Sequence, residues 1–124
     1  MRARLLEILG IARGTSNEGA GLSLREAMTR ARYGEVRATL GAADLLPLLE
    51  ADPGLTSDWL LYAENKRTSA GWYLLLAAEI GREGDDGSRR RFASLEQAVA
   101  EYVVLELNYW ADRRAGCRHE GQPR

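Results

Sequence analysis

Two short apolar runs on either side of a polar segment constrain the fold more than any other feature of this chain. Residues 59–63 read WLLYA and residues 72–80 read WYLLLAAEI, with ENKRTSAG between them. Short runs that are rich in Trp, Tyr and Leu and bounded by polar residues and Gly favour strands over helices. The pattern therefore predicts a β-hairpin from Trp59 to Ile80, with an ordered, charged loop over residues 64–71.

The second run predicts a strand with two apolar faces. Side chains alternate along a strand, so Trp72 and Leu74 point to one side and Tyr73 and Leu75 to the other. A solvated face would carry polar residues at alternate positions, so we expect this strand to be central and covered on both faces. Because two strands alone are marginally stable in water, a third strand, a helical layer or a partner chain must complete the sheet.

The N-terminal region predicts a short helix and a linker. Residues 1–13 carry a helical apolar stripe, and the Gly-rich residues 14–21 have the composition of a flexible linker. Two placements of this helix are open. It either packs on the core of its own chain or reaches a neighbouring molecule as an arm.

Local signals predict further short helices before the hairpin. Ser23 and Glu26 have the spacing of a capping box, which opens a helix over about 24–32 that Gly34 ends. Residues 35–40, EVRATL, alternate polar and apolar and favour an edge strand, with a helical turn as the alternative. Asp44 is expected to cap a helix over 45–49 with Pro47 in its first turn, and residues 52–54, DPG, end it.

The C-terminal part predicts a polar loop over 81–91, then a long helix over 95–113 opened by a second capping box, Ser94 with Gln97. Residues 115–124 lack apolar anchors and are expected to be a disordered tail. Residues 1–114 then form one globular domain. The fold class is α+β: a small antiparallel sheet built on a central β-hairpin, packed by the long C-terminal helix, with two or three short N-terminal helices.

One residue of the long helix departs from its apolar pattern. With a turn of about 100° per residue, Glu106 falls inside the arc formed by Val99, Tyr102, Tyr109 and Trp110. A carboxylate at such a position is buried and paired, lines a functional pocket, or meets water where the helix lifts off the sheet. The sequence leaves these three interpretations open.

The composition disfavours several classes of function. The 124 residues carry a net charge of −1, so no global field selects nucleic acid or anionic membrane. One Cys precludes an intramolecular disulfide, and no signal peptide or membrane-spanning run is evident, so we expect a cytoplasmic protein. The only His, His119, and the only Cys, Cys117, lie in the tail, so we expect no metal and no cofactor.

Two polar clusters are candidate binding sites. The 64–71 loop is the densest group of donors and acceptors, and a site of this type recognises a carboxylate, a phosphate or an acidic patch. Its candidate residues are Glu64, Lys66, Arg67, Thr68 and Ser69, together with Glu106. The second cluster, Arg89, Arg90 and Arg91, lies just ahead of a helix N-terminus and is a weaker candidate for binding an anion.

These features predict a non-enzymatic protein-interaction module, of the class that includes adaptors and immunity-like proteins. The dominance of Arg over Lys favours a GC-rich, bacterial-type genome. The two-sided strand and the detachable first helix predict a homodimer. The alternative is a small-molecule or anion-binding enzyme domain, in which Lys66 and Arg67 act as electrophiles and Glu64 or Glu106 as a base. It requires Glu106 and the loop to converge on one concave pocket.

Overall fold

The protein has the predicted α+β fold, in which a small antiparallel sheet packs against a long C-terminal helix. The sheet has three strands in the described part of the chain. A computed structural model describes residues 2–16, 21–66 and 70–121, with residues 114–121 described by their backbone alone. The elements in chain order are α1 (Arg2–Leu9), α2 (Ile11–Thr15), α3 (Leu24–Arg30), α4 (Tyr33–Val36), α5 (Ala42–Ala51), α6 (Pro53–Asn65), β1 (Trp72–Leu75), β2 (Glu79–Arg82), β3 (Asp85–Arg91) and α7 (Leu95–Gly121).

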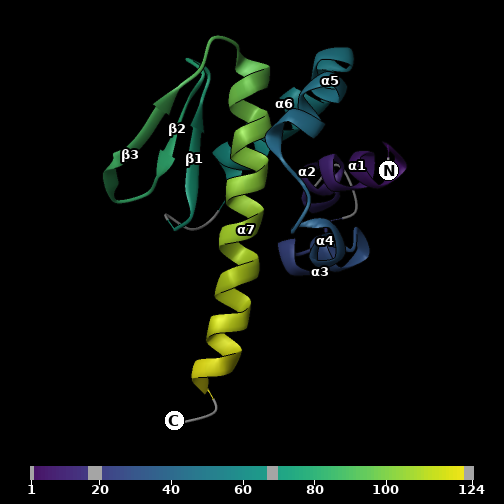
Figure 1. Ribbon diagram of the computed structural model, residues 1–124, viewed down its shortest axis with the longest axis vertical. Coiled ribbons are helices and arrows are strands. Elements are labelled where there is room, and N and C mark those ends of the chain that lie inside the picture. The colour runs from purple at the N-terminus through teal and green to yellow at the C-terminus, as the bar shows by residue number, and fades with distance from the viewer. Residues whose placement is uncertain (1, 17–20, 67–69, 122–124) are drawn as a thin grey trace.

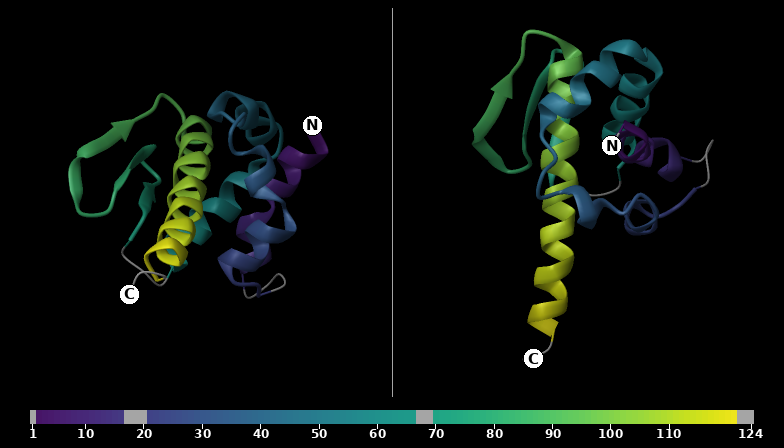
Figure 2. Two further views of the ribbon diagram at one scale, coloured as in Figure 1. Left: turned by 60° about the horizontal axis from the view of Figure 1, so that its bottom comes forward. Right: turned by 45° about the vertical axis from the view of Figure 1, so that its right-hand side comes forward.

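Helix α7 lies between the sheet and the other helices (Figures 1 and 2). The sheet, in the order β1-β2-β3, packs on one side of α7, whereas α1 to α6 lie on the other side. Helix α6 touches both α7 and β1 and so connects the two layers. The apolar residues predicted for the long helix therefore pack against the sheet on one side of α7 and against the other helices on the opposite side.

The first predicted strand is wrong, because residues 59–63 lie inside helix α6. This helix begins strongly: the Asp52 side chain accepts a hydrogen bond from the Gly54 amide, and Pro53 occupies the first helical position. Thr56 and Trp59 then fall on its buried face, one turn apart. A run of five apolar residues fits the period of a strand as well as that of a helix. The helix cap upstream, at Asp52, favours the helix.

The run predicted to be the second strand, residues 72–80, is divided between two strands that form a hairpin. Strands β1 and β2 pair from Trp72 opposite Arg82 to Leu75 opposite Glu79, and the chain reverses between them. Ala78 adopts a left-handed conformation, with φ of 62°, and its amide donates to the Leu75 carbonyl at 3.0 Å. The central hairpin therefore exists, but it spans residues 72–82 instead of 59–80.

The third strand comes from residues 81–91, which the sequence predicts to be a polar loop. A turn at Gly84, which has φ of +80°, brings β3 back along β2. The ladder is irregular between Ile80 and Arg82, where the Ser88 hydroxyl accepts from the Arg82 amide at 2.6 Å. The mostly exposed side chains of β3 carry no apolar pattern, which is why its sequence does not resemble that of a strand.

Only one face of the sheet is covered, contrary to the prediction. Trp72, Leu74 and Ile80 are buried. By contrast, Leu75 is 47% exposed, and Leu76 in the following turn is 78% exposed. On the open face the Tyr73 ring lies across Gly81, the residue opposite it in β2. A side chain at position 81 would occupy the space of that ring.

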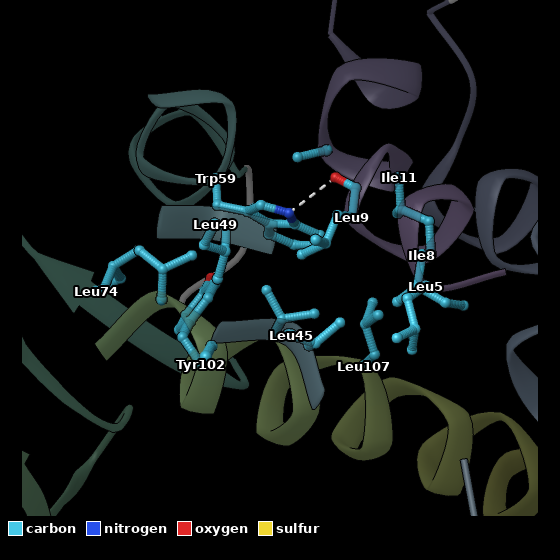
Figure 3. Packing of buried hydrophobic residues seen from close by; sticks show 14 of the residues in the cluster. Leu5, Ile8, Leu9, Ile11, Leu45, Leu49, Trp59, Leu74, Tyr102 and Leu107 are labelled. Atoms are coloured by element: carbon cyan, nitrogen blue, oxygen red, sulfur yellow. Dashed lines mark hydrogen bonds between the residues drawn. The ribbon is translucent and has the colours of Figure 1, made fainter. Parts of the chain in front are cut away.

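The N-terminal helix packs on the core of its own chain, which resolves the two placements left open. Leu5, Ile8 and Leu9 of α1 are buried in the cluster shown in Figure 3. The indole Nε1 of Trp59 donates to the Leu9 carbonyl at 2.9 Å inside this cluster (Figure 3). Because that carbonyl lies at the end of α1, the bond ties the end of the first helix to α6.

The predicted caps are mostly confirmed. Ser23 and Glu26 form the capping box of α3, and Ser94 and Gln97 make the corresponding pair of hydrogen bonds ahead of α7. Asp44 does cap a helix, but from its third position, where its carboxylate accepts from the Gly41 amide at 2.9 Å. Helix α5 thus begins earlier than predicted.

The predicted edge strand over 35–40 is wrong. Residues Tyr33–Val36 form the short helix α4, so Gly34 lies inside a helix and does not terminate α3. Arg32, with φ of 55°, makes the left-handed step between the two helices instead. Tyr33 and Val36 are buried three residues apart, a helical spacing that the alternating pattern conceals.

Helix α7 is longer than predicted and continues to Gly121. Its fully buried positions lie between Ala98 and Leu107, and its C-terminal turns extend beyond the rest of the molecule (Figure 1). The helix therefore runs through most of the segment that the sequence predicts to be a disordered tail. That this segment is dispensable stays a prediction.

Candidate functional site

Glu106 is fully buried and accepts four hydrogen bonds. Its Oε2 accepts from the Tyr62 hydroxyl at 2.8 Å, the Lys66 Nζ at 2.8 Å and the Trp110 Nε1 at 2.9 Å. Its Oε1 accepts from the Trp72 amide at 2.8 Å. Of the three interpretations of Glu106, the structure shows the buried and paired one.

Two helical spacings and one strand end assemble this network. Glu106 and Trp110 lie one turn apart on α7, and Tyr62 and Lys66 lie one turn apart at the end of α6. Trp72 is the first residue of β1 and supplies its backbone. The network therefore joins α6, α7 and β1 at the point where the helical layer meets the sheet.

Lys66 is held on two sides. Its Nζ donates to the Trp72 carbonyl at 2.9 Å as well as to Glu106, and its side chain is only 8% exposed. Trp72 is thus bound through both backbone groups, its amide to Glu106 and its carbonyl to Lys66. The ion pair therefore holds the first residue of β1 through its backbone.

Gly71 lets the chain pass close to the carboxylate. Its φ is +86°, and a Cβ at this position would lie 2.6 Å from Glu106 Oε1 and 3.2 Å from both Lys66 Nζ and Trp110 Nε1. A side chain is excluded both by the backbone conformation and by the space available. The glycine is therefore part of the site.

Aromatic rings enclose the network on the side of the core. Trp59, Tyr62 and Tyr102 contact one another edge to face, with ring centroids 5.2 to 6.4 Å apart. Burial, reinforced by the charge of Glu106, raises the pKa of both phenols well above the usual range. Both tyrosines therefore stay protonated at neutral pH.

Of the predicted site residues that the structure describes, Lys66 and Glu106 are brought together. Glu64 is exposed near the end of α6. Arg67, Thr68 and Ser69 lie outside the described residues. The polar segment that contains them is not a hairpin loop, because it connects helix α6 to strand β1.

Sequence reasoning missed Tyr62, Gly71, Trp72 and Trp110 as members of the site. Two of them have a helical spacing from a residue of the Lys66–Glu106 ion pair. Trp110 follows Glu106 by four residues, and Tyr62 precedes Lys66 by four. That signal becomes visible only once 59–65 is recognised as helical, since the strand interpretation places Tyr62 elsewhere. The roles of Gly71 and the Trp72 backbone have no sequence signal.

Arg89, Arg90 and Arg91 lie along β3, and all three are exposed. The Arg90 guanidinium lies 6.0 Å from the centre of the Trp72 ring, and Arg91 Nε lies 3.2 Å from Glu79 Oε1. Arranged along a strand, the three charges alternate between the two faces of the sheet. Anion binding by this cluster stays a prediction.

A small polar chain lies on the open face of the sheet. Glu79 accepts from the Tyr73 hydroxyl at 2.9 Å and from Arg91. The Tyr73 hydrogen bond, followed by Arg91, lowers the pKa of the Glu79 carboxyl. These contacts hold the three strands together across the face that no helix covers.

A cleft of about 1100 Å³ lies beside the Glu106 network, between α2, the start of α3, α6 and α7. Tyr62, Lys66 and Trp110 line its wall, and Glu106 lies behind them, outside the lining. Arg13 and Asp58, 3.7 Å apart, form an ion pair at its edge. Lys66 therefore reaches the cleft, whereas the carboxylate that could act as a base does not.

Comparisons with known families, curated proteins and solved structures find no match to this chain. Within the described ranges, no helix has the length and apolar character needed to cross a membrane.

Proposed function

We propose that this protein is a non-enzymatic protein-interaction module. The chemistry of the buried pair supports this proposal. Glu106 has both oxygens occupied by protein donors, and Lys66 is bound to the carboxylate and to a backbone carbonyl. A general base must reach its substrate and an electrophile needs a free cation. Glu106 is fully buried behind the cleft wall and Lys66 is paired with it, so both groups hold β1 against the helices.

The observation that carries the proposal is the pair of exposed leucines at the β1–β2 turn. Leu76 is 78% exposed and Leu75 is 47% exposed, and both lie next to the sheet face that no helix covers. Exposed apolar side chains on a rigid element supply the anchors that protein interfaces use. The neighbouring Tyr73, Glu79 and Arg91 provide a polar rim around them.

The setting that we propose is the cytoplasm of a bacterial-type cell. The support is compositional: a single Cys, a net charge of −1 and an Arg-rich basic set. A partner that docks on the leucines would be a folded protein with a complementary apolar pocket.

Affinity capture from the native host tests this function. The full chain and a Leu75→Ser/Leu76→Ser variant are used as baits, and the captured proteins are quantified by mass spectrometry. We expect the variant to lose a specific partner that the unmodified chain retains. Leu6→Ser is the matched control, because Leu6 is 40% exposed on α1 and lies away from the sheet. A partner lost equally from both variants, or from neither, contradicts the proposal.

The cleft beside Lys66 supports a second candidate function, binding of a small molecule or anion. Its volume suits a small organic ligand, the 60% exposed side chain of Arg13 supplies positive charge, and Trp110 supplies an aromatic wall. Thermal-shift measurements with a panel of phosphates and carboxylates test it. A stabilisation that Arg13→Ala abolishes, while Arg25→Ala on the surface of α3 leaves it intact, would favour this candidate.

A further inference from the structure

Leu75, Glu79 and Arg91 lie in one row across the three strands. Leu75 of β1 is paired with Glu79 of β2, and Glu79 is paired with Arg91 of β3. Directly opposed residues of an antiparallel sheet point to the same face, so all three side chains lie on the face that no helix covers. Because neighbouring strands lie about 4.8 Å apart, the backbones of Leu75 and Arg91 are separated by roughly 10 Å.

The end of β3 also approaches the exposed β1–β2 turn. The Phe92 amide donates to the Ala78 carbonyl at 3.0 Å, which ties the residue after Arg91 to the last residue of that turn. Leu76 lies in the same turn and is 78% exposed. The two exposed leucines and the arginine therefore share one end of the sheet, where β1 and β3 both finish (Figure 1).

Arg91 is fixed on one side and open on the other. Its Nε donates to Glu79 Oε1 at 3.2 Å, yet 75% of its side chain stays accessible. Among the described residues neither of its Nη groups has a hydrogen-bond partner, so these groups face solvent as a fork. A planar guanidinium fork binds a carboxylate through two parallel hydrogen bonds.

The carboxylate beside Arg91 is already engaged inside the molecule. One oxygen of Glu79 accepts from the Tyr73 hydroxyl and the other from Arg91. Only 11% of the Glu79 side chain is accessible. The accessible charge of this row is therefore that of Arg91, and it is positive.

We propose that Leu75, Leu76 and Arg91 form one docking surface for a folded protein that carries a carboxylate beside an apolar pocket. The leucines enter the pocket, and the Nη groups of Arg91 bind the carboxylate. This contact rests on the proposed function, since it uses the same leucines, and it adds the chemistry of the partner. A guanidinium positioned by Glu79 suits one fixed carboxylate. The diffuse charge of an anionic membrane needs no such positioning, and the net charge of −1 supplies no general attraction to it.

Arg90 provides a contrast within the same strand. It is paired with Ile80, whose side chain is buried, and its guanidinium lies 6.0 Å from the centre of the Trp72 ring. Arg90 therefore lies on the opposite face of the sheet from Leu75. Arg90 and Arg91 are both exposed and adjacent but occupy different faces, which makes Arg90 the matched control.

Capture from a soluble extract of the native host, cleared of membranes, tests this surface. The probes are the proteins that the unmodified chain retains and that Leu75→Ser/Leu76→Ser loses. We expect Arg91→Gln to reduce their recovery by about 10-fold or more, the typical effect of losing a hydrogen bond to a charged group. High salt should weaken the same capture. Arg90→Gln should leave the recovery unchanged.

Glu79→Gln separates a direct contact from a structural role of Arg91. It removes the charge that pairs with Arg91 but leaves the guanidinium in place, so the captured proteins should be retained. If Arg91 acted only by pairing with Glu79, Glu79→Gln and Arg91→Gln would lose the same proteins. Arg91→Lys should recover only part of the capture, because an ammonium lacks the planar fork. Thermal melts show whether each bait is folded.

Capture that depends on the leucines but survives Arg91→Gln, or that falls equally with Arg90→Gln, would overturn the carboxylate contact and leave the proposed function standing. The absence of any leucine-dependent protein would contradict the proposed function, and this surface with it. Two further measurements test other occupants. Leucine-dependent binding to vesicles of phosphatidylcholine and phosphatidylserine would assign the surface to a lipid and overturn the proposal. A dimer in light scattering that Leu75→Ser/Leu76→Ser dissociates would assign it to a second copy of the chain, with the same consequence.

Discussion

Gly71 and Glu106 are in such close contact that a Cβ on the glycine would lie 2.6 Å from Oε1 of the carboxylate. The glycine belongs to the segment that enters β1, and the glutamate lies in the middle of α7. Their contact brings the two layers of the molecule together at one buried, charged point. The absence of a side chain at residue 71 is thus as important to the site as the carboxylate itself.

Gly71→Ala should destabilise the protein far more than Gly84→Ala. Both glycines have positive φ, +86° and +80°, but a Cβ at Gly84 meets nothing within 4 Å. The alanine at 84 should cost about 1 to 2 kcal/mol from its backbone conformation alone. The alanine at 71 should cost roughly 3 kcal/mol or more, because it must also displace Glu106. Urea unfolding of the two variants checks this, and equal losses would show that the close contact is unimportant.

Lys66→Met should destabilise the fold by about 3 to 5 kcal/mol, because it leaves the buried Glu106 carboxylate without its cation. Adding Glu106→Gln should recover part of that loss, since the neutral amide no longer needs a cation. The matched control is Arg37→Met. Arg37 Nη2 lies 2.6 Å from Asp112 Oδ1, but the Asp112 side chain is 71% exposed, so this loss should stay below about 1 kcal/mol. Chemical denaturation of the four proteins measures the difference.

The contribution of Glu79 to stability should depend on pH. The hydrogen bond from Tyr73, and then Arg91, lowers the pKa of Glu79 below its ordinary value of 4.5 in the folded protein. A lowered folded-state pKa stabilises the protein above the unfolded pKa, and that stabilisation is lost as the pH falls through the folded value. The melting temperature of the unmodified protein should therefore exceed that of Glu79→Gln most at neutral pH, and the gap should close in acid.

Tyr73→Phe isolates the cause of that shift. Without the phenolic hydroxyl, the pKa of Glu79 should move back toward 4.5, which an NMR titration of the Glu79 carboxyl carbon records directly. Glu50→Gln, at an exposed position on α5, should change the melting temperature equally little at every pH. A Glu79 titration that Tyr73→Phe leaves unchanged would count against the hydrogen bond as the main cause.

Removal of the residues after Arg114 should change the melting temperature by less than about 2 °C, because the last turns of α7 extend beyond the core (Figure 1). Truncation after Asn108 is the contrasting variant. It removes Trp110 and its hydrogen bond to Glu106, and it should lower the melting temperature by much more. A large loss from the shorter truncation would show that this segment docks, and would return attention to Cys117 and His119.

The structural features that the sequence predicts correctly depend mainly on local spacing. Both capping boxes follow from a serine three residues ahead of Glu26 or Gln97. The unusual position of Glu106 follows from the helical wheel, because α7 is long enough for the period to be unambiguous. The fold class follows from one long helix and a short apolar run with strand composition.

The errors arise where a short run fits two periods. Residues 59–63 are apolar throughout and fit either a strand or a helix, and a helix begins upstream at Pro53, after the Asp52 cap. In β3 the strand is made by its pairing with β2 and has no apolar pattern of its own. Short elements of this kind take their conformation from their neighbours.

The sequence by itself determined that a carboxylate would lie within the apolar arc of the last helix, because a helical period is a local property. Only the tertiary structure decided what that carboxylate meets. Lys66 is 40 residues from Glu106 along the chain, and the Trp72 amide is 34 residues away. Burying a charge is unfavourable unless donors converge on it, and the packing of α6 and β1 against α7 is what brings them there.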